Sequence, residues 1–324
     1  MQLRDITTAY EHEMAIVESL LEKEQNSYVK LIPEISRHII MSGGKRIRPL
    51  LLMITADLFG YRGEGRYPLA TVIEFIHTAS LLHDDVIDHA SMRRGKASAN
   101  RVWGNAASVL VGDYLYATAH RLLTEINNQT VQQLVAWATT AMVEGETIQL
   151  MRSGDVNITE EEYLSITEKK TAVLMAVACA LGAVLAEAPE SSVDIMKRFG
   201  MKLGVTFQMT DDTLDYVGIE EEFGKTIGMD IMEGKMTLPL IWSLKQCPAG
   251  EGDRIRAIIA GKTVGDKEVF EVARFINAYG GIDYARERAG RFVEEAKQLL
   301  TPFPDSFPKK ALLSMSDHVL QRNL

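Results

Sequence analysis

IEFIHTASLLHDDVIDHASMRR, residues 73–94, carries the clearest helical pattern of the chain. Steps of 4, 3, 4 and 4 place five of its residues along one face of an α-helix: Ile73, His77, Ser80, Asp84 and Asp88. Asp85 lies beside this face. Carboxylates one turn apart on an otherwise apolar helix repel one another unless a hard cation lies between them. The stretch therefore predicts a helix that carries a divalent metal site.

A second copy of the DDxxD pattern lies in FQMTDDTLDY, residues 207–216. Gln208, Asp211 and Asp215 fall at steps of 3 and 4, with Asp212 alongside. One DDxxD pattern is as typical of a solvated acidic patch as of a metal site. Two copies on apolar helices favour the metal site. We expect the two copies to face one another and to hold Mg²⁺ together with the oxygens of a polyphosphate.

Basic residues flank both aspartate patterns. They occur in GGKRIR (43–48), at Arg93 and Arg94, in KKT (169–171), and at Lys225 and Lys235. Arginine suits bidentate contacts to phosphate, and lysine supplies a point charge. Each of these residues alone is typical of a solvated surface. As a set beside the acidic patterns, they predict a diphosphate site.

The rest of the chain predicts an all-α fold. Of its 324 residues only 9 are Pro, and the stretches between Gly/Pro breaks are too long for strands and show no sustained apolar alternation. Thr159 and Glu162 form a capping-box pattern that marks a helix start. The apolar run 172–186 is shorter than the roughly 20 residues that span a bilayer, so we interpret it as a core helix. We predict about ten or more helices in a single domain, residues 1–324.

Composition excludes several classes of protein. Lys and Arg number 35 against 44 Asp and Glu, and the net charge of -9 excludes general nucleic-acid binding. Two cysteines, Cys179 and Cys247, exclude a disulfide framework. The N-terminal residues lack the apolar segment of a secretory signal. We expect a cytoplasmic protein with at most transient membrane contact.

Together the motifs resemble those of the trans-prenyl (E-polyprenyl) diphosphate synthases, from about residue 30 to the C-terminus. The resemblance rests on GGKRIRP (43–49), HTASLLHDDVID (77–88), MRRGK (92–96), GETIQL (145–150), KKT (169–171), QMTDDTLD (208–215) and GKTIGMD (224–230). It implies a helical bundle around a deep central cavity, usually as a homodimer. It also implies two or three Mg²⁺ ions and a reaction that joins an allylic diphosphate to isopentenyl diphosphate.

The resemblance further implies a role for each motif position. The metal ligands would be Asp84, Asp85, Asp88, Asp211, Asp212 and Asp215. Contacts to the allylic substrate would come from Arg93, Lys170, Thr171, Gln208, Lys225 and Lys235. Isopentenyl diphosphate would be held by Lys45, Arg48, His77 and Arg94. The ionisation step would depend most on Asp84, Asp85, Asp88, Asp211, Asp212, Lys170 and Lys225. No nucleophilic side chain is needed, because the released diphosphate can take the proton.

Product length is expected to depend on the turn before the first aspartate pattern. One helical turn rises about 5.4 Å, close to one extended isoprene unit, so Ala79 and Ser80 decide whether a growing tail can pass. Both are small, which favours a long-chain product. The first motif most resembles that of the octaprenyl diphosphate synthases of quinone side-chain synthesis, and this resemblance implies a product of octaprenyl length. The alternatives are a farnesyl or geranylgeranyl diphosphate synthase, a class I terpene cyclase, and a non-catalytic subunit of a heteromeric synthase.

Overall fold

The structure is a computed structural model, and it describes residues 1–217, 228–248, 250–261 and 264–321. Nearly all of the regular structure in these residues is helical, which confirms the all-α prediction. They form two compact units. Unit 1 comprises Met1–Thr139, Val177–Lys197 and Pro304–Leu312, and unit 2 comprises Thr140–Ala176, Arg198–Phe303 and Leu313–Leu324. The single domain and the central cavity stay predictions.

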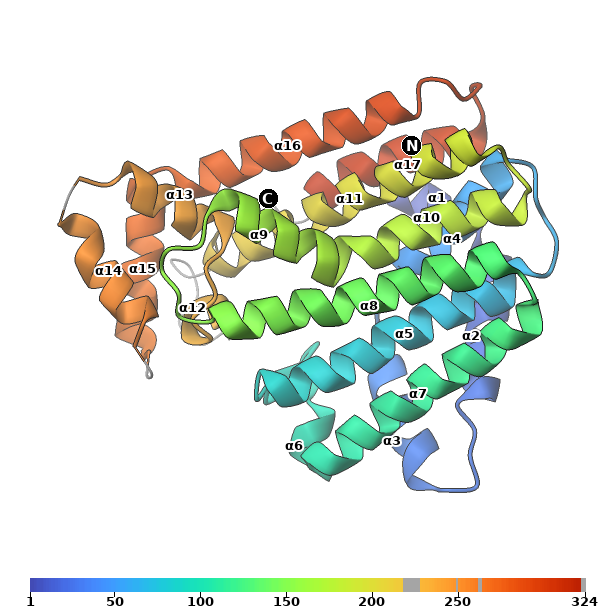
Figure 1. Cartoon of the computed structure of the whole chain (residues 1–324), viewed down its shortest axis with the longest axis horizontal. Coiled ribbons are helices and arrows are strands. Elements are labelled where there is room, and N and C mark those ends of the chain that lie inside the picture. The colour runs from blue at the N-terminus through green and yellow to red at the C-terminus, as the bar shows by residue number, and fades with distance from the viewer. Residues whose placement is uncertain (218–227, 249, 262–263, 322–324) are drawn as a thin grey trace. The chain divides into compact units, whose positions relative to one another are not determined.

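In unit 1, α5 is the central helix. The elements of this unit are α1 (Leu3–Ala9), α2 (Glu11–Glu24), α3 (Leu31–Ile40), α4 (Ile47–Leu58), α5 (Arg66–Ile87), β1 (Met92–Arg93), β2 (Lys96–Ala97), α6 (Ala99–Trp103) and α7 (Asn105–Ile126). Helix α5 packs against α2, α4 and α7, and Figure 1 shows α5 and α7 side by side. Because α5 has neighbours on several sides, apolar residues such as Ile73, Phe75 and Leu82 are fully buried. The predicted helix over residues 73–88 is confirmed, with Asp88 as its C-cap residue.

Unit 2 contains the second aspartate pattern. Its own elements are α9 (Glu160–Thr167), the π-helical segment η1 (Glu168–Ala172), α12 (Met229–Met232), α13 (Leu238–Gln246), α14 (Glu251–Ile259), α15 (Asp266–Ala278) and α16 (Gly281–Leu299). Four helices contribute residues to both units: α8 (Gln129–Arg152), α10 (Val173–Leu185), α11 (Glu190–Val217) and α17 (Phe307–Leu320). The predicted capping box is confirmed, because Thr159 Oγ1 accepts from the Glu162 amide and Glu162 Oε2 from the Thr159 amide.

Two local features were not predicted from the sequence. The KKT motif lies in π-helical η1, a type of segment that is frequent at functional sites. Residues 92–97 form a hairpin in which Arg93 pairs with Lys96. Its two loop residues, Arg94 and Gly95, have φ values of 51° and 76°, as a type I′ turn requires. Glycine adopts this left-handed conformation without strain, which explains its place in MRRGK.

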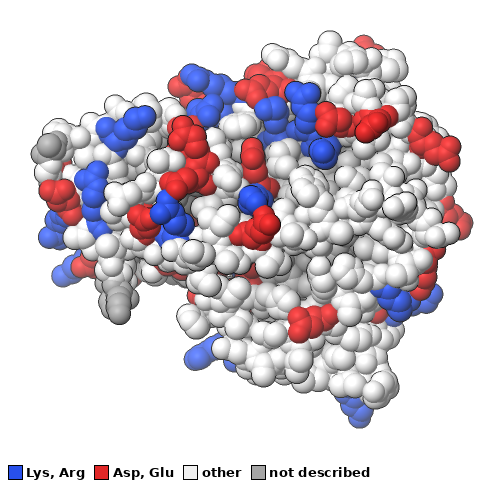
Figure 2. Space-filling model, in the orientation of Figure 1, with Lys and Arg blue, Asp and Glu red and all other residues white. Residues whose placement is uncertain are grey.

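The apolar run 172–186 forms helix α10, whose side chains are buried over most of its length. In the part of the chain that the structure describes, no helix has both the length and the apolar character needed to cross a membrane. Acidic and basic side chains are interspersed over the face drawn in Figure 2. Exposed pairs such as Arg291 and Glu287 on α16, 2.6 Å apart, contribute at most about 1 kcal/mol. Exposed ion pairs of this kind therefore add little to stability and do not by themselves indicate a functional site.

Candidate active site

The first aspartate motif, residues 84–88, lies at the C-terminal end of α5. The negative end of the helix dipole disfavours carboxylates at this position, so three of them need nearby cations. Asp85 is fully buried, and its Oδ1 accepts hydrogen bonds from Arg93 Nε, at 2.8 Å, and from Arg93 Nη2. Burial raises the pKa of the Asp85 carboxyl, and the Arg93 guanidinium opposes that rise. Arg93 thus keeps a buried carboxylate available in its charged form.

The second oxygen of Asp85 is suited to a metal ion. Oδ2 is buried and accepts no hydrogen bond from any described residue. Leaving a buried carboxylate oxygen unsatisfied is unfavourable, and a hard cation would satisfy it. No three His, Cys, Asp or Glu side chains in the described ranges are grouped closely enough to hold a metal by themselves. The residues therefore fit a magnesium ion whose other ligands are phosphate oxygens and water.

The hairpin after the motif also carries Arg94 to the loop before α4. An added Cβ at Gly44 would lie 2.9 Å from Arg94 Nη1, so the guanidinium packs where Gly44 lacks a side chain. Lys45 follows on the same loop and is exposed, whereas Arg48 lies in the first turn of α4. The structure therefore brings the predicted residue Arg94 to the GGKRIR segment, as one anion site would require.

We define the cationic cluster as four arginines around His77: Arg46, Arg48, Arg93 and Arg94. Burial and the positive charge of these arginines hold the pKa of His77 well below its usual range. Burial, followed by repulsion from Arg46 and Arg93, also lowers the pKa of Arg94. Arg46 is held by Glu18 and Glu74, and Arg93 is held by Asp85. The neutral imidazole of His77 and the guanidinium groups of Arg48 and Arg94 are therefore the members of the cluster that suit an anion such as a diphosphate.

The second aspartate motif, residues 211–215, lies in the last turns of α11. Asp212 is buried, and both of its oxygens accept hydrogen bonds: Oδ2 from the Tyr163 hydroxyl at 2.6 Å, and Oδ1 from Gln208 Nε2 at 2.7 Å. Gln208 Oε1 in turn accepts a hydrogen bond from Thr171 Oγ1 at 2.9 Å. The predicted residues Asp212, Gln208 and Thr171 therefore form one network, with Tyr163 as a member that the sequence did not indicate.

We define the acidic cluster as Asp212, Asp215 and Asp230. Asp215 accepts hydrogen bonds from the backbone amides of Gly228 and Asp230, each at 3.0 Å, at the start of α12. Burial raises the pKa of Asp212 to about 6, against the hydrogen bonds from Tyr163 and Gln208. Burial, together with repulsion from Asp212 and Asp215, raises the pKa of Asp230 well above its usual range. These carboxylates, of which Asp212 is buried and Asp215 and Asp230 are half-buried, oppose one another's ionisation, so a nearby cation would favour their charged forms.

One pocket of unit 2 is lined by five predicted site residues together with Tyr163 and Asp230. The five are Lys170, Thr171, Gln208, Asp212 and Lys235. Lys170 contacts Glu146 of the GETIQL motif at 2.5 Å. An added Cβ at Gly145 would lie 2.6 Å from the Lys170 amide nitrogen, so a glycine is needed for η1 to approach α8. This contact accounts for the glycine of GETIQL and for the position of Lys170 in the pocket.

The remaining predicted residues are placed as follows. Asp211 is exposed, and Asp84 and Asp88 are half-buried. Ala79 is buried one turn before the first motif, and the hydroxyl of Ser80 donates to the His77 carbonyl at 2.8 Å. Lys225 lies outside the described residues.

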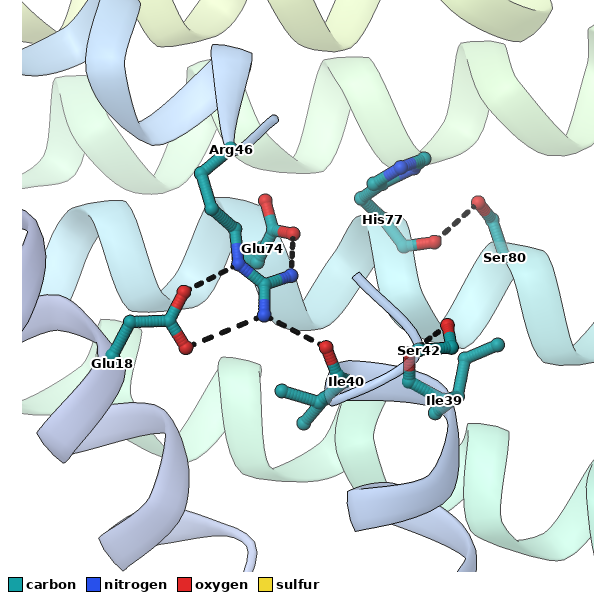
Figure 3. A network of polar contacts seen from close by, with 8 residues as sticks. All are labelled: Glu18, Ile39, Ile40, Ser42, Arg46, Glu74, His77 and Ser80. Carbon is teal, nitrogen blue, oxygen red and sulfur yellow. Dashed lines mark hydrogen bonds and ion pairs between the residues drawn. The ribbon is translucent and has the colours of Figure 1, made fainter. Parts of the chain in front are cut away.

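Three residues of the site were not predicted from the sequence, and for two of them a sequence pattern could have indicated a role. Arg46 stands inside the quoted GGKRIRP motif, and its partner Glu74 (Figure 3) is a buried acid between the apolar residues Ile73 and Phe75 of α5. Asp230 ends the quoted GKTIGMD motif. Tyr163 had no signal, because an aromatic residue on an amphipathic helix is most often part of the core.

The chain is similar to known proteins over its whole length. The chain is 38% identical to the octaprenyl diphosphate synthase of Escherichia coli over the full length of both proteins. It is 34% identical to component 2 of the heptaprenyl diphosphate synthase of Geobacillus stearothermophilus, again over the full length of both. The structure of a polyprenyl synthase from Caulobacter crescentus in complex with calcium and isoprenyl diphosphate superposes with a TM-score of 0.94. That protein is 37% identical, and the match covers 98% of this chain and 97% of that one.

The all-α fold and these relatives define the chain as a prenyltransferase. The chain belongs to the polyprenyl synthetase family, whose model matches residues 29–276. The matched range contains both aspartate motifs and the segments that form the cationic and acidic clusters.

Proposed function

We propose that the chain condenses isopentenyl diphosphate with farnesyl or geranylgeranyl diphosphate in a Mg²⁺-dependent reaction. The product would be a long-chain all-trans polyprenyl diphosphate, octaprenyl in length, for quinone side chains. The observation that carries this proposal is the buried, unsatisfied Oδ2 of Asp85 beside Arg93, which fits a metal bound to a diphosphate. The calcium and isoprenyl diphosphate in the Caulobacter crescentus relative support the same ligand classes here.

In this reaction both aspartate motifs would hold Mg²⁺, through Asp84, Asp85, Asp88, Asp211, Asp212 and Asp215. When bound, the metal withdraws charge from the leaving diphosphate. The chain's own residues bind and orient: Arg93, Lys170, Lys225 and Lys235 bind the allylic diphosphate, while Lys45, Arg48, His77 and Arg94 hold isopentenyl diphosphate. The dipoles of Thr171 and Gln208 stabilise the allylic cation. The allylic C–O bond breaks, the C–C bond forms, and the released diphosphate takes the proton.

Small side chains before the first motif support a long product. Ala79 is buried, and the Ser80 hydroxyl is satisfied within α5, so neither residue presents a bulky or polar barrier. Ala79→Phe should shorten the principal product by at least one isoprene unit, because a ring one turn below Asp84 would block the tail. Thin-layer or mass analysis of the products measures this change. An unchanged product distribution would show that the tail does not pass this turn.

We further propose that a second copy of the chain covers exposed apolar side chains. In unit 1, α7 exposes Val109 and Leu110, and in unit 2 the end of α8 exposes Leu150 and Met151. Large apolar side chains that are exposed at neighbouring positions of a helix would be stabilised if a partner covered them. The heptaprenyl relative is named as a component, so a different subunit is the alternative occupant. Light scattering on the purified chain distinguishes a homodimer from a monomer that awaits such a subunit.

The experiment that tests the proposed function is product analysis. The purified chain is incubated with labelled isopentenyl diphosphate, farnesyl diphosphate and Mg²⁺, and the products are sized. A linear polyprenyl diphosphate of octaprenyl length is expected. A cyclised hydrocarbon would indicate a terpene cyclase, a product that stops at geranylgeranyl would indicate a short-chain synthase, and no product from folded protein would indicate a non-catalytic subunit.

A further inference from the structure

The side chain of Arg46 connects three elements of unit 1. Nε and Nη2 donate to the two oxygens of Glu18 on α2, at 2.6 and 3.3 Å, and Nη2 also donates to the Ile40 carbonyl at the end of α3, at 2.9 Å. Nη1 donates to Glu74 Oε1 on α5 at 2.6 Å. Figure 3 shows the guanidinium enclosed by these partners. All three of its nitrogens are engaged within the protein, so Arg46 is not arranged to bind a substrate itself.

The backbone of Arg46 has an unfavourable conformation, which the hydrogen bonds of its side chain stabilise. Its φ and ψ values are 45° and 40°, in the left-handed region that a non-glycine residue rarely occupies. Arg46 is also the N-cap residue of α4, where the chain turns from the loop into the helix. Lys45 precedes this turn and Arg48 follows it. The conformation of Arg46 therefore fixes the backbone positions from which the side chains of Lys45 and Arg48 extend.

Glu74 gives the same contact a second consequence. It is buried on α5 one turn before His77, and its charge acts on Arg94. The Arg46 and Glu74 side chains are 11% and 5% exposed, so this is a nearly dry ion pair. Such pairs add little net stability compared with apolar packing, and a positioning role explains why one is placed here. Arg46 also neutralises an acid that would otherwise oppose an anion at His77.

We propose that Arg46, held by Glu18 and Glu74, is the positioning residue of the isopentenyl diphosphate site. It sets the loop that carries Lys45 and Arg48 against the α5 face that carries His77. This inference rests on the proposed function and adds to it a residue that acts through others. It predicts that loss of Arg46 weakens the binding of one substrate and leaves the other substrate unaffected.

The test is steady-state kinetics of Arg46→Gln with each substrate varied in turn. We expect KM for isopentenyl diphosphate to rise at least about tenfold, because misplaced cations lose contacts to the diphosphate. KM for farnesyl diphosphate and kcat should stay within about threefold of wild type. Arg46→Lys, which keeps the charge but loses the two-oxygen contact to Glu18, should give an intermediate KM.

Arg66→Gln is the matched control. Arg66 is also a buried arginine of unit 1, and it pairs with Asp57 and Glu13 at the start of α5. Its loss should lower the unfolding midpoint without a selective change in KM. If Arg46→Gln does not fold, Glu18→Gln removes the charge of the more exposed partner and should raise KM for isopentenyl diphosphate about fivefold, beyond the threefold range allowed for the other constants.

Two results separate failure of this inference from failure of the proposed function. If wild type incorporates isopentenyl units but the two KM values of Arg46→Gln rise together, or neither changes, Arg46 is merely structural and the inference is wrong. If wild type incorporates no isopentenyl units, the proposed function itself fails.

Discussion

The cationic cluster of unit 1 and the acidic cluster of unit 2 have opposite effects on their own titratable groups. In the cationic cluster, burial and four arginines keep the pKa of His77 low. In the acidic cluster, burial and neighbouring carboxylates raise the pKa values of Asp212 and Asp230. In one region, nearby guanidinium groups disfavour a further positive charge, and in the other, nearby carboxylates disfavour a further negative charge.

This difference indicates which ligand each region can accept first. Arg48 and Arg94 of the cationic cluster can bind a diphosphate without a metal ion, because guanidinium groups are direct partners for phosphate. The acidic cluster must gain a cation before an anion can approach it. The first aspartate motif is intermediate, because Arg93 balances part of the charge of Asp85 and leaves one oxygen for a metal.

The largest expected effect comes from Asp85→Asn. It removes a buried charge that we assign to metal binding, so kcat should fall about 10²- to 10³-fold at saturating Mg²⁺. Asp212→Asn should reduce kcat only about tenfold, because both oxygens of Asp212 already accept hydrogen bonds from Tyr163 and Gln208 and are less available to a metal ion than Asp85 Oδ2. The rate of diphosphate release at saturating substrate gives kcat for both variants. Equal losses would break the distinction between the two motifs.

An intermediate effect is expected from Tyr163→Phe. The change removes the hydroxyl that donates to Asp212 and leaves a buried carboxylate oxygen without its partner, so the free energy of unfolding should fall by about 1–3 kcal/mol. The matched control is Tyr216→Phe in the same unit, whose buried hydroxyl forms a hydrogen bond with the neutral Thr237 hydroxyl. Urea denaturation compares the two variants. A larger loss for Tyr216→Phe would contradict the importance of the charge on Asp212.

The smallest expected effect is the response of stability to pH, which should differ in sign between the two clusters. The pKa of Asp212 is raised to about 6, so its contribution to stability is present at low pH and is lost as pH rises through 6. The pKa of His77 is lowered, so the unfolded chain takes up a proton first and stability falls as pH drops below about 6.5.

Variants separate these two contributions. When pH falls from 7.5 to 5.5, Asp212 should increase the free energy of unfolding by about 1 kcal/mol, and the Asp212→Asn variant should lack this increase. Over the same range His77 should decrease the free energy of unfolding, and the His77→Asn variant should lack this decrease. Urea midpoints at the two pH values measure both changes without substrate or metal. Changes of the same sign would contradict the opposite electrostatics of the two clusters.

Periodicity and local signals predicted what depends on neighbours in the sequence. The stripe that leads to Asp84, the capping box at Thr159 and the buried helix after residue 172 are all present. Long-range partners left no such signal. The π-helical turn at KKT depends on close packing against Gly145, and the pairs of Arg46 with Glu74 and of Tyr163 with Asp212 join segments 28 and 49 residues apart. These contacts depend on the packing of segments that are distant in the sequence, so no local pattern predicts them.

The most direct test of the account is the metal dependence of substrate binding. Isothermal titration of the wild-type chain with isopentenyl diphosphate, and separately with the unreactive farnesyl thiodiphosphate, is carried out with Mg²⁺ and with EDTA. Because the cationic cluster needs no metal, the affinity for isopentenyl diphosphate should change by less than about threefold. The affinity for the allylic analogue should fall at least about 30-fold in EDTA, because aspartates would then face its diphosphate without a cation. Equal losses for the two ligands, or tight binding of the allylic analogue in EDTA, would contradict the account.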